Sequence, residues 1–464
     1  MWFNNFLESV DNRLYTYILI PLLLIAGVYF SFKTKFVQFR LIKDACKSLT
    51  EKAEKGKVSS FKSLMISTAS KIGVGHIAGI ASAIVIGGPG SVFWMWIMAL
   101  LGSASAFIES TLAQIYKVKD GNSFRGGPAY YIQKAFNKKW LGVLFSCLLI
   151  AGYAYGFNAL QAFQLSSVLT PYIKGYSKSI YPLIVGVVLS IITALVIWGG
   201  THRIGFISAY VVPVMSIAYI VLSLYIAIKN YDKIPEVLSD IFKQAFNFRA
   251  IFGSMFYKSA LMMGTKRGLF SNEAGMGSSP NAAATADVTH PVNQGLAQVL
   301  SVFIDTMLIC SATAFIVLLS GVDLKCGLED IPFVQASVYS QVGDFGVNLI
   351  AFSIFAFAFT SIIGNYCYAE TNVLFIKNSN VLLNVFRVTC VIAVFLGAQA
   401  DAKTVWNLSD LFMGLMAVVN IIVILVIGNI AIKALKDYTN QKKEGKIPVF
   451  IAKDAGINDA ELWK

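Results

Sequence analysis

Long apolar runs are the feature that most restricts what this 464-residue chain can fold into. A membrane-spanning helix needs about 20 mostly apolar residues, and the sequence contains eleven such runs: Tyr15–Phe32, Leu64–Gly88, Ser91–Tyr116, Leu141–Ile173, Ile180–Thr201, Ile204–Ile228, a glycine-interrupted region from Phe252 to about Thr285, Val292–Val322, Phe345–Ala369, Val381–Ala400 and Thr404–Ile432. Only 14% of the residues are charged, against about 25% in soluble chains. We therefore predict an all-α membrane protein with eleven transmembrane helices, which excludes a cytosolic enzyme, a disulfide scaffold and a disordered regulator.

The charges between the runs predict the orientation of the chain. The residues before the first run are acidic and no small-residue cleavage site follows it, so a retained helix is favoured over a signal peptide. Nine Lys and Arg residues lie between Lys33 and Lys62, and basic loops stay in the cytoplasm. The N-terminus is then outside and the lysine-rich C-terminal tail inside. This topology accounts for the net charge of +13 without a nucleic-acid partner.

The spacing of the runs predicts an inverted repeat. The runs starting at residues 91, 141, 180 and 204 have counterparts that start 201, 204, 201 and 200 residues later. Each half then holds five spans, and an odd number inverts the second copy, as in many secondary transporters. The predicted organisation is an extra first helix with a basic loop (1–62), two five-helix repeats (63–248 and 249–433) and a cytoplasmic tail (434–464).

Glycines and polar residues interrupt the first helix of each half. In the first half the interruption is Gly73-Val-Gly75, and non-helical backbone at that depth is tolerated only around an enclosed cavity. The N–H groups of Val74 and Gly75 would face a carboxylate, while carbonyls before the break would face a cation. Close helix packing through Gly75 and Gly79 is the alternative.

The matching segment in the second half runs from Gly264 to Pro280 and carries three charged residues in a glycine-interrupted apolar region. Lys266, Arg267 and Glu273 must pair or face water, and we expect Glu273 to pair with one of the two cations as a structural clamp. Ser271 and Asn272 are candidates for holding an amino group or an ion. Asp305, in a later span, is a functional candidate because charges inside a membrane are costly.

Two further polar positions complete the predicted site. Thr360 and Ser361 place adjacent hydroxyls in an apolar span, and hydroxyl oxygens suit a sodium ion. A hydrogen bond back to the carbonyl four residues earlier is the common alternative for such hydroxyls. Gln161 lies within a span and either reaches a substrate or bridges two helices.

Several strings together resemble the alanine-or-glycine:cation symporter family over residues 60–430. They are Gly73-Val-Gly75, Ala78-Gly79, Gly87–Trp96, Phe124–Tyr131, Phe270-Ser-Asn-Glu-Ala-Gly-Met-Gly277, His290-Pro291, Phe303-Ile-Asp-Thr306 and Trp406 with Asp410. The resemblance implies a leucine-transporter-type fold with an added first helix. It also implies sodium-coupled, sometimes proton-coupled, uptake of a small neutral amino acid by alternating access.

The resemblance also implies roles for single residues. The backbone of Gly73, Val74 and Gly75 would hold the substrate carboxylate, with Gln161, Ser271 and Asn272 nearby. The sodium site would consist of the Ala69 and Ile72 carbonyls and the Thr360 and Ser361 hydroxyls.

Two positions of the predicted site depart from the family pattern. His76 and Phe163 both stand where the family usually has Asn. Neutral imidazole is a poor sodium ligand, so a second sodium site is in doubt. His76 either adds pH dependence or is a buried, neutral, hydrogen-bonded residue. Phe163 would make the pocket smaller or more apolar, so alanine or glycine is the first expectation, with glutamine or serine as alternatives.

Other functional classes have less support. A channel would need a charged ring or a filter loop, and an enzyme would need a catalytic or metal-binding constellation; the sequence contains neither pattern. We expect no cofactor and no metal besides Na⁺, which acts as the coupling ion. The expected partners are a small neutral amino acid, Na⁺ or H⁺ and membrane lipid. The expected form is a monomer in the bacterial cytoplasmic (inner) membrane.

Overall fold

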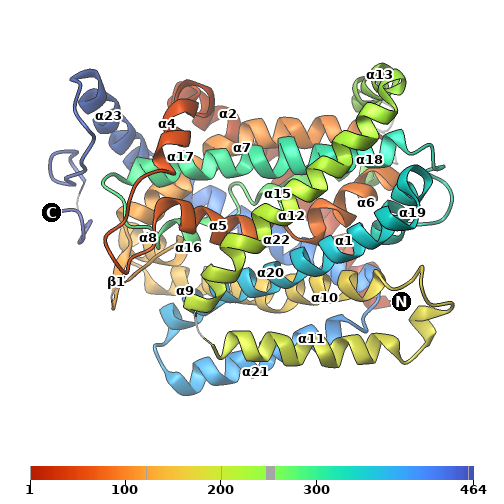
Figure 1. Cartoon of the computed structure of the whole chain (residues 1–464). Helices are drawn as coiled ribbons and strands as arrows, with labels where there is room; N and C mark the ends of the chain where they lie inside the picture. Colours follow the sequence, from red (N-terminus) through yellow and green to blue (C-terminus); the bar gives the residue numbers. More distant parts are fainter. Residues whose placement is uncertain (1, 122, 200, 247–255, 458) are drawn as a thin grey trace.

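The computed structural model describes residues 2–464 except 122, 200, 247–255 and 458, and its main elements are helices (Figure 1). Within the described part, eight helices are long and apolar enough to cross a membrane. They span Asn4–Lys33, Gly90–Ile115, Lys139–Ser167, Tyr210–Lys229, Pro291–Leu319, Asp344–Ile376, Asn380–Gly397 and Ala402–Ile427. Each of them overlaps an apolar run of the sequence, so a multi-pass helical membrane protein is confirmed.

The three remaining runs form shorter or broken helices. Helix α5 (Ser60–Lys71) and the segment that ends in α6 (Ala78–Gly87) meet at an angle of 64°, and together they make a ninth candidate span. Helix α11 (Tyr181–Ile197) is apolar but short. The glycine-interrupted region forms α15 (Ala260–Asn272) and α16 (Ser279–Ala283), while its start at Phe252 and the repeat boundary at 248–249 lie outside the described residues. Eleven crossings therefore stay a prediction.

The first helix is longer than its apolar run. It begins at Trp2 rather than near Tyr15, and comprises α1 (Trp2–Leu14), a π-helical turn (Tyr15–Leu19) and α2 (Ile20–Lys33). Helix α1 is amphipathic and packs on α22 (Ala402–Ile427). Its polar residues explain why hydropathy marks only the second half of the helix.

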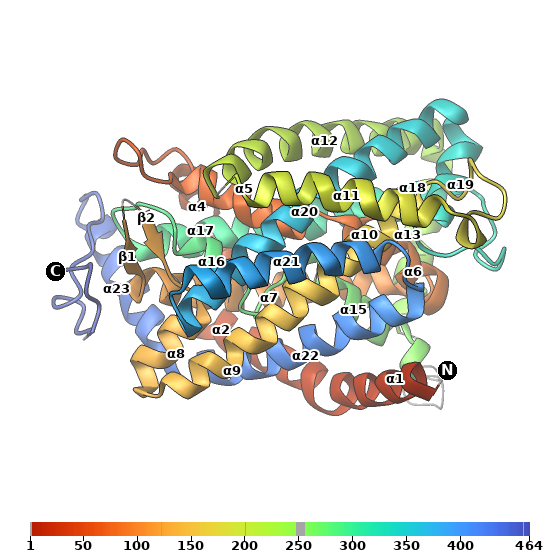
Figure 2. The same ribbon diagram turned by 90° about the horizontal axis from the view of Figure 1, so that it is seen from below.

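The broken helices lie among the long ones. Helix α7 (Gly90–Ile115) packs along α15 and α17 (Pro291–Val302). Helix α17 continues through a π turn (Phe303–Cys310) into α18 (Ser311–Leu319). Two further long helices lie beside the breaks. One is α20 (Asp344–Ile376). The other is continuous and consists of α9 (Lys139–Leu149), the π-helical segment η3 (Ile150–Phe157) and α10 (Asn158–Ser167). Helices α11 and α21 (Asn380–Gly397) pair at one side of the bundle (Figures 1 and 2).

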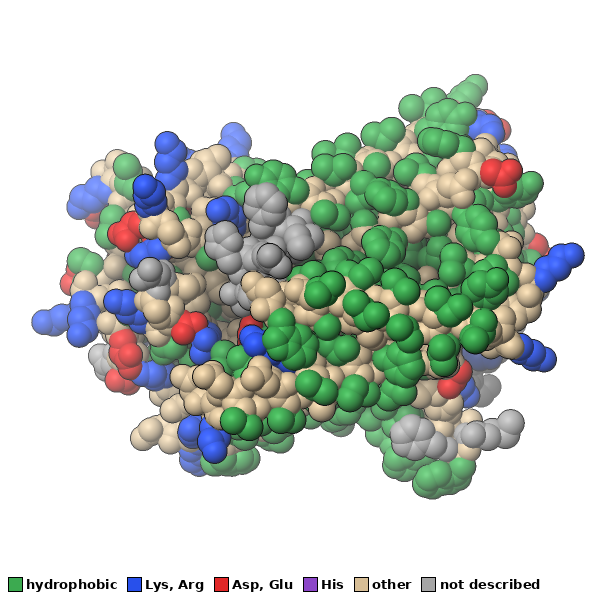
Figure 3. Space-filling view, turned by 60° about the horizontal axis from the view of Figure 1, so that its bottom comes forward, with side chains coloured by type: hydrophobic (Ala, Val, Ile, Leu, Met, Phe, Trp, Pro, Cys, Tyr) green, Lys and Arg blue, Asp and Glu red, His purple; other side chains and the backbone are tan. Residues whose placement is uncertain are grey.

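The two ends of the bundle differ. The N-terminus lies at the end that carries α13 (Ile234–Ala245) and α19 (Asp330–Val342), and the C-terminus at the opposite end (Figures 1 and 2). That second end carries α4 (Ile42–Ser48), α8 (Pro128–Phe136), α23 (Asn429–Lys443) and a hairpin of β1 (Val118–Asp120) with β2 (Ser123–Arg125). Lys and Arg side chains gather at this end beyond a broad hydrophobic surface (Figure 3). The assignment of this end to the cytoplasm remains a prediction.

Glycine occurs at both helix breaks, and the second break depends on its backbone freedom. In the first, Gly73 has extended backbone between α5 and a 3₁₀ turn at Val74–His76. In the second, Glu273 has φ 55°, and Gly275 and Gly277 have φ 80° and 85°. These left-handed conformations end α15 and are readily adopted by glycine, whereas Glu273 pays a steric cost for its own.

Candidate functional site

The backbone of the first break faces Gln161 of α10. A Cβ atom on Gly73 would lie well under 3.0 Å from the Ser361 hydroxyl and 2.5 Å from the side-chain nitrogen of Gln161, so a larger residue would displace these two side chains. The Val74 N–H donates a 3.1 Å hydrogen bond to Gln161 Oε1. The amide that was predicted to meet a substrate carboxylate thus already points at an acceptor oxygen. Gln161 bridges two helices and also lies at the break, so both of its predicted roles agree with its position.

One of the two predicted sodium-site hydroxyls faces the first break. The Ser361 hydroxyl donates a 3.0 Å hydrogen bond to the Ala69 carbonyl, which brings α20 and the end of α5 together. The Thr360 hydroxyl instead donates to Ala356 and Phe357 carbonyls of its own helix, at 2.9 and 3.1 Å. Ile72 directly follows α5 with ψ 78°, outside the helical range. The structure therefore joins Ala69 and Ser361 and leaves Thr360 in the alternative, helix-bonded arrangement.

The two breaks meet at His76 and Ser271. His76 is fully buried, and its Nε2 lies 3.2 Å from the Ser271 hydroxyl at the end of α15. The same hydroxyl lies 2.9 Å from Cys310 Sγ and 3.4 Å from the Thr306 hydroxyl. The carbonyl of His76 accepts a 2.7 Å hydrogen bond from Thr313. The position of His76 therefore agrees with the role of a buried residue that connects neighbouring helices.

An aromatic cluster covers the first break. Phe270 packs against Phe157 and Trp406, with ring centroids 4.8 and 5.4 Å apart. A Cβ atom on Gly75 would lie well under 3.0 Å from the Phe270 ring. The glycine therefore allows an aromatic ring of the second broken helix to touch the backbone of the first.

Phe163 does not lie at the first break beside Gln161. It lines a cavity of about 260 Å³ together with Gln164 and Asp330. Residues two apart in a helix point about 200° away from each other, so Phe163 and Gln161 face different surroundings. The prediction that Phe163 shapes the pocket beside Gln161 gains no support from this placement.

A buried glutamate supports the second break. The Glu109 carboxylate of α7 accepts hydrogen bonds of 3.1 Å from the backbone N–H groups of both Gly275 and Gly277. Asn420 of α22 donates to the same carboxylate at 2.7 Å and to the Gly275 carbonyl at 2.9 Å. The backbone donors of this break are thus already satisfied by a carboxylate of the protein. The side-chain oxygen of Asn272 accepts a 2.9 Å hydrogen bond from Ala274 N–H, and its buried side-chain nitrogen has no hydrogen-bond partner.

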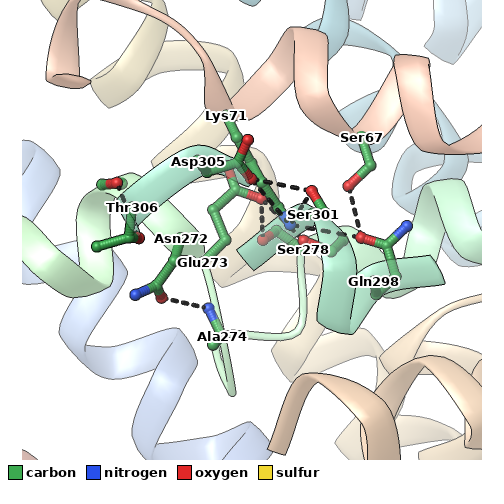
Figure 4. A network of polar contacts seen from close by, with 12 residues as sticks. Ser67, Lys71, Asn272, Glu273, Ala274, Ser278, Gln298, Ser301, Asp305 and Thr306 are labelled. Atoms are coloured by element: carbon green, nitrogen blue, oxygen red, sulfur yellow. Dashed lines mark hydrogen bonds and ion pairs between the residues drawn. The ribbon is translucent and has the colours of Figure 1, made fainter. Parts of the chain in front are cut away.

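A lysine that the sequence analysis did not single out lies at the first break. Lys71 is fully buried, and its Nζ lies 3.1 Å from Ser301 Oγ, 3.4 Å from Gln298 Oε1 and 3.7 Å from Asp305 Oδ2 (Figure 4). The sequence does contain a sign of this residue, because Lys71 is a charged side chain within the apolar run Leu64–Gly88. Glu273 lies next to this group and accepts a 2.6 Å hydrogen bond from the Ser278 hydroxyl.

The expected clamp between Glu273 and Lys266 or Arg267 is wrong. Arg267 forms a bidentate pair with Asp410, at 2.8 and 3.0 Å, and its guanidinium lies 3.9 Å from the Trp406 ring centroid. Lys266 pairs with Asp11 of the added first helix. The two cations lie within α15, whereas Glu273 comes after the helix has ended, so the side chains face different neighbours. The paired charges line a cavity of about 560 Å³.

The opposite end of the bundle is closed by the chain's own tail. Trp463 donates a 2.8 Å hydrogen bond from its indole to the Gln114 carbonyl. Lys117, just after α7, lies over the rings of Phe124 and Trp463, 4.0 and 4.9 Å from their centroids, and donates to the Ala286 carbonyl at 2.8 Å. Burial lowers the pKa of Lys117 to about 7. A lysine whose charge changes near neutral pH therefore connects the tail to the β-hairpin and to the loop after the second break.

His290 fastens the same end. Its Nδ1 caps α17 by accepting a 3.2 Å hydrogen bond from Val292 N–H, and its Nε2 lies 3.2 Å from Asp437 of α23. Burial lowers the pKa of His290, although the neighbouring Asp437 acts against that shift. The His290-Pro291 motif is thus a helix start that contacts the C-terminal helix.

Comparison with known sequences identifies relatives along the whole chain. The profile of the sodium:alanine symporter family matches residues 1–452. The chain is 43% identical to the amino-acid carrier protein AlsT of Bacillus subtilis, over 100% of this chain and 98% of the relative. It is 45% identical to the probable sodium/glutamine symporter GlnT of the same organism (98% and 94%). It is 33% identical to the sodium/alanine symporter AgcS of Methanococcus maripaludis (96% and 99%).

Solved structures show the same fold at low sequence identity. MhsT in complex with L-phenylalanine matches with a TM-score of 0.55 and 13% identity, over 88% of this chain and 95% of that one. A manganese transporter of Eremococcus coleocola matches with a TM-score of 0.54 and 13% identity (84% and 87%). Both are transporters of the leucine-transporter fold, as predicted. The family and the helical bundle together show that this protein is a membrane transporter rather than an enzyme, and that the chain belongs to the sodium:alanine symporter family.

Proposed function

We propose that this protein is a sodium-coupled symporter that imports a small neutral amino acid, alanine or glycine first, by alternating access in the bacterial cytoplasmic membrane. The observation that carries the proposal is the hydrogen bond between Val74 N–H and Gln161 Oε1 at the first break. A substrate carboxylate that replaces the glutamine oxygen would gain a charge-assisted hydrogen bond to an N–H that is already oriented. Gln161 would then turn its amide toward the substrate.

The proposed sodium site lies beside the same backbone. Ala69 and Ser361 join α5 to α20 through a 3.0 Å hydrogen bond. A sodium ion would take both oxygens as ligands and would hold these two helices together more strongly than one hydrogen bond does. Binding of the ion would thereby favour one arrangement of the first broken helix, which is what coupling to substrate requires.

The packing above the first break supports a short substrate side chain. Phe270 touches Gly75 and is held by Phe157 and Trp406. A methyl group needs little displacement of these rings, whereas a glutamine side chain needs more. The chain is 45% identical to GlnT, a probable sodium/glutamine symporter, and 33% identical to AgcS, a sodium/alanine symporter, so glutamine is the substrate that the test must compare with alanine.

The test is uptake of labelled alanine by purified protein in liposomes. Accumulation should require an inward sodium gradient and should vanish when potassium replaces sodium on both sides. Equal accumulation in potassium would refute sodium coupling. A competition panel of unlabelled neutral amino acids then orders the substrates, and stronger inhibition by glutamine than by alanine would overturn the proposed substrate.

His76 offers a second test of the site. We expect His76→Asn to preserve uptake and to leave its pH profile unchanged, because His76 is buried and bonded to Ser271. A changed pH profile would instead make His76 a titrating part of the site.

A further inference from the structure

A hollow lined by basic residues lies at the C-terminal end of the bundle, the end that we predict to face the cytoplasm (Figure 1). It is formed by the chain around the end of α2, where the first candidate span stops, and by α23, which follows α22 directly. Its volume is about 320 Å³. Among the described residues, its lining includes no acidic side chain and five basic ones, which together we call the basic pocket: Lys33, Lys35, Arg40, Lys436 and Lys443.

The side chains of the basic pocket are not neutralised by the protein. In the described part of the chain, none of the five forms an ion pair. Arg40 donates a 3.3 Å hydrogen bond to the Thr34 carbonyl, which uses only part of its guanidinium. The rule that basic loops stay in the cytoplasm explains why Lys and Arg lie at this end. It does not explain why those from the two ends of the sequence share one hollow, where they repel one another.

The neighbouring acidic residues already have other partners. Three of them lie in α4 and in or just after α23, and each contacts a residue outside the basic pocket: Asp44 contacts Lys442, Asp437 contacts His290 and Glu444 contacts Lys446. The anion that would offset the repulsion in the basic pocket therefore has to come from outside the chain.

Exposed aromatic side chains beside the basic pocket favour a lipid over a soluble anion. Phe32, Phe36 and Phe39 are 67%, 42% and 54% exposed, and each is next in sequence to a basic residue of the pocket. The rings of Phe32 and Phe36 meet edge to face, with centroids 5.2 Å apart. These residues follow directly on a membrane span, where acyl chains are at hand. A phospholipid would place its phosphate among the cations and its chains on the rings, whereas a soluble phosphate would leave the rings exposed.

We propose that the basic pocket binds the phosphate of an anionic phospholipid from the leaflet on that side of the membrane. Lysine and arginine would donate charge-assisted hydrogen bonds to the phosphate oxygens, as basic pockets between membrane helices do for other lipid head groups. The bound lipid would connect the added first helix to the C-terminal helix α23. The proposal does not depend on which amino acid or ion the protein transports.

The experiment measures lipid binding to the purified full chain in detergent micelles. Labelled phosphatidylglycerol, which is anionic, is compared with labelled phosphatidylcholine, which has no net charge. We expect the native chain to bind phosphatidylglycerol about tenfold or more tightly than phosphatidylcholine. Lys35→Gln combined with Lys436→Gln removes one cation from each side of the basic pocket and should weaken phosphatidylglycerol binding about tenfold, with phosphatidylcholine binding unchanged.

The matched control removes two charges elsewhere at the same end. Lys52 and Lys55 are exposed in the loop after α4 and do not line the basic pocket. Lys52→Gln combined with Lys55→Gln should change phosphatidylglycerol binding less than about twofold. A larger loss in this control than in the pocket variant would show that net charge alone determines binding, and would overturn the proposal.

Two further results would overturn it. One is equal binding of the two lipids by the native chain, and the other is displacement of phosphatidylglycerol by the same concentration of soluble glycerol phosphate, which would make the pocket a site for free phosphate. If the pocket variant does not fold, the native chain is measured at high salt instead. Salt screens exposed charges, so the preference for phosphatidylglycerol should then fall, and a preference that salt leaves unchanged would refute the proposal.

Discussion

The contact between Gly75 and Phe270 allows a sharp test of how the two broken helices fit together. In Gly75→Ala the added methyl group would lie well under 3.0 Å from the Phe270 ring. The ring cannot retreat freely, because Phe157 and Trp406 pack on it with centroids 4.8 and 5.4 Å away. Overpacking of this kind costs about 1–3 kcal/mol. The cost applies only while the two broken helices hold this arrangement. The population of this arrangement, relative to other arrangements of the helices, should therefore fall about 5–150-fold.

The matched control is Gly79→Ala, four residues further along in α6. A Cβ atom at Gly79 would lie 3.4 Å from both Arg267 and Trp406, which is close to ordinary contact. If the observed arrangement belongs to the transport cycle, the initial rate of sodium-driven alanine uptake should fall about fivefold or more in Gly75→Ala and less than about twofold in Gly79→Ala. Both rates are normalised to the amount of folded protein.

A second substitution identifies the cause. Phe270→Leu removes part of the ring and should recover some of the activity lost in Gly75→Ala, because the two positions share one contact. Equal uptake by Gly75→Ala and Gly79→Ala would refute the reasoning, and so would a double variant that is no better than Gly75→Ala alone.

Three further predictions concern other parts of the molecule. Ser361→Ala should raise the sodium concentration for half-maximal uptake about tenfold, because the Ser361 hydroxyl faces α5. Thr360→Ala should raise it by less than about threefold, because the Thr360 hydroxyl bonds within its own helix. Equal shifts in the two variants would contradict this assignment. Glu109→Gln should lower the thermal unfolding temperature, because one backbone N–H of the second break loses its acceptor at a cost of about 1–3 kcal/mol; an unchanged unfolding curve would argue against it. Burial lowers the pKa of Lys117 to about 7, so the state with the Trp463 segment docked binds fewer protons than the undocked state, and docking should strengthen as pH rises from about 7 to 9. Proteolysis of the tail, normalised to cleavage of a free peptide, should slow over that range and Lys117→Met should remove the effect; a pH-independent rate in the native chain would disprove it.

The apolar runs and the positions of the glycines predict most of the fold. Apolar runs predict helices because burial in lipid demands them, and the interruptions at Gly73 and Gly275 predict the breaks because few other residues fit there. The first helix was placed too short, since α1 packs an amphipathic face on α22 and hydropathy does not detect this.

Pairings between distant segments were harder to predict. The sequence indicated that Glu273 must pair or face water, but its neighbours depend on which way the chain turns after α15. Asp11 lies 255 residues from Lys266 in sequence, and spacing gives no signal for that pair. Thr360 and Ser361 are adjacent and chemically alike, so only the rotation of α20 decides which hydroxyl faces the break.

Glu109 has a consequence for the symmetry of the fold. The two halves of the chain each offer a broken helix, and in principle each could receive an acid group. The backbone donors of the second break are already taken by a carboxylate of the protein, with Asn420 holding that carboxylate in place. A zwitterion would therefore enter with its acid end toward the first break only. An amino acid with a second acid group would have no vacant cradle for it, so discrimination against aspartate and glutamate would follow from the protein having filled that position itself.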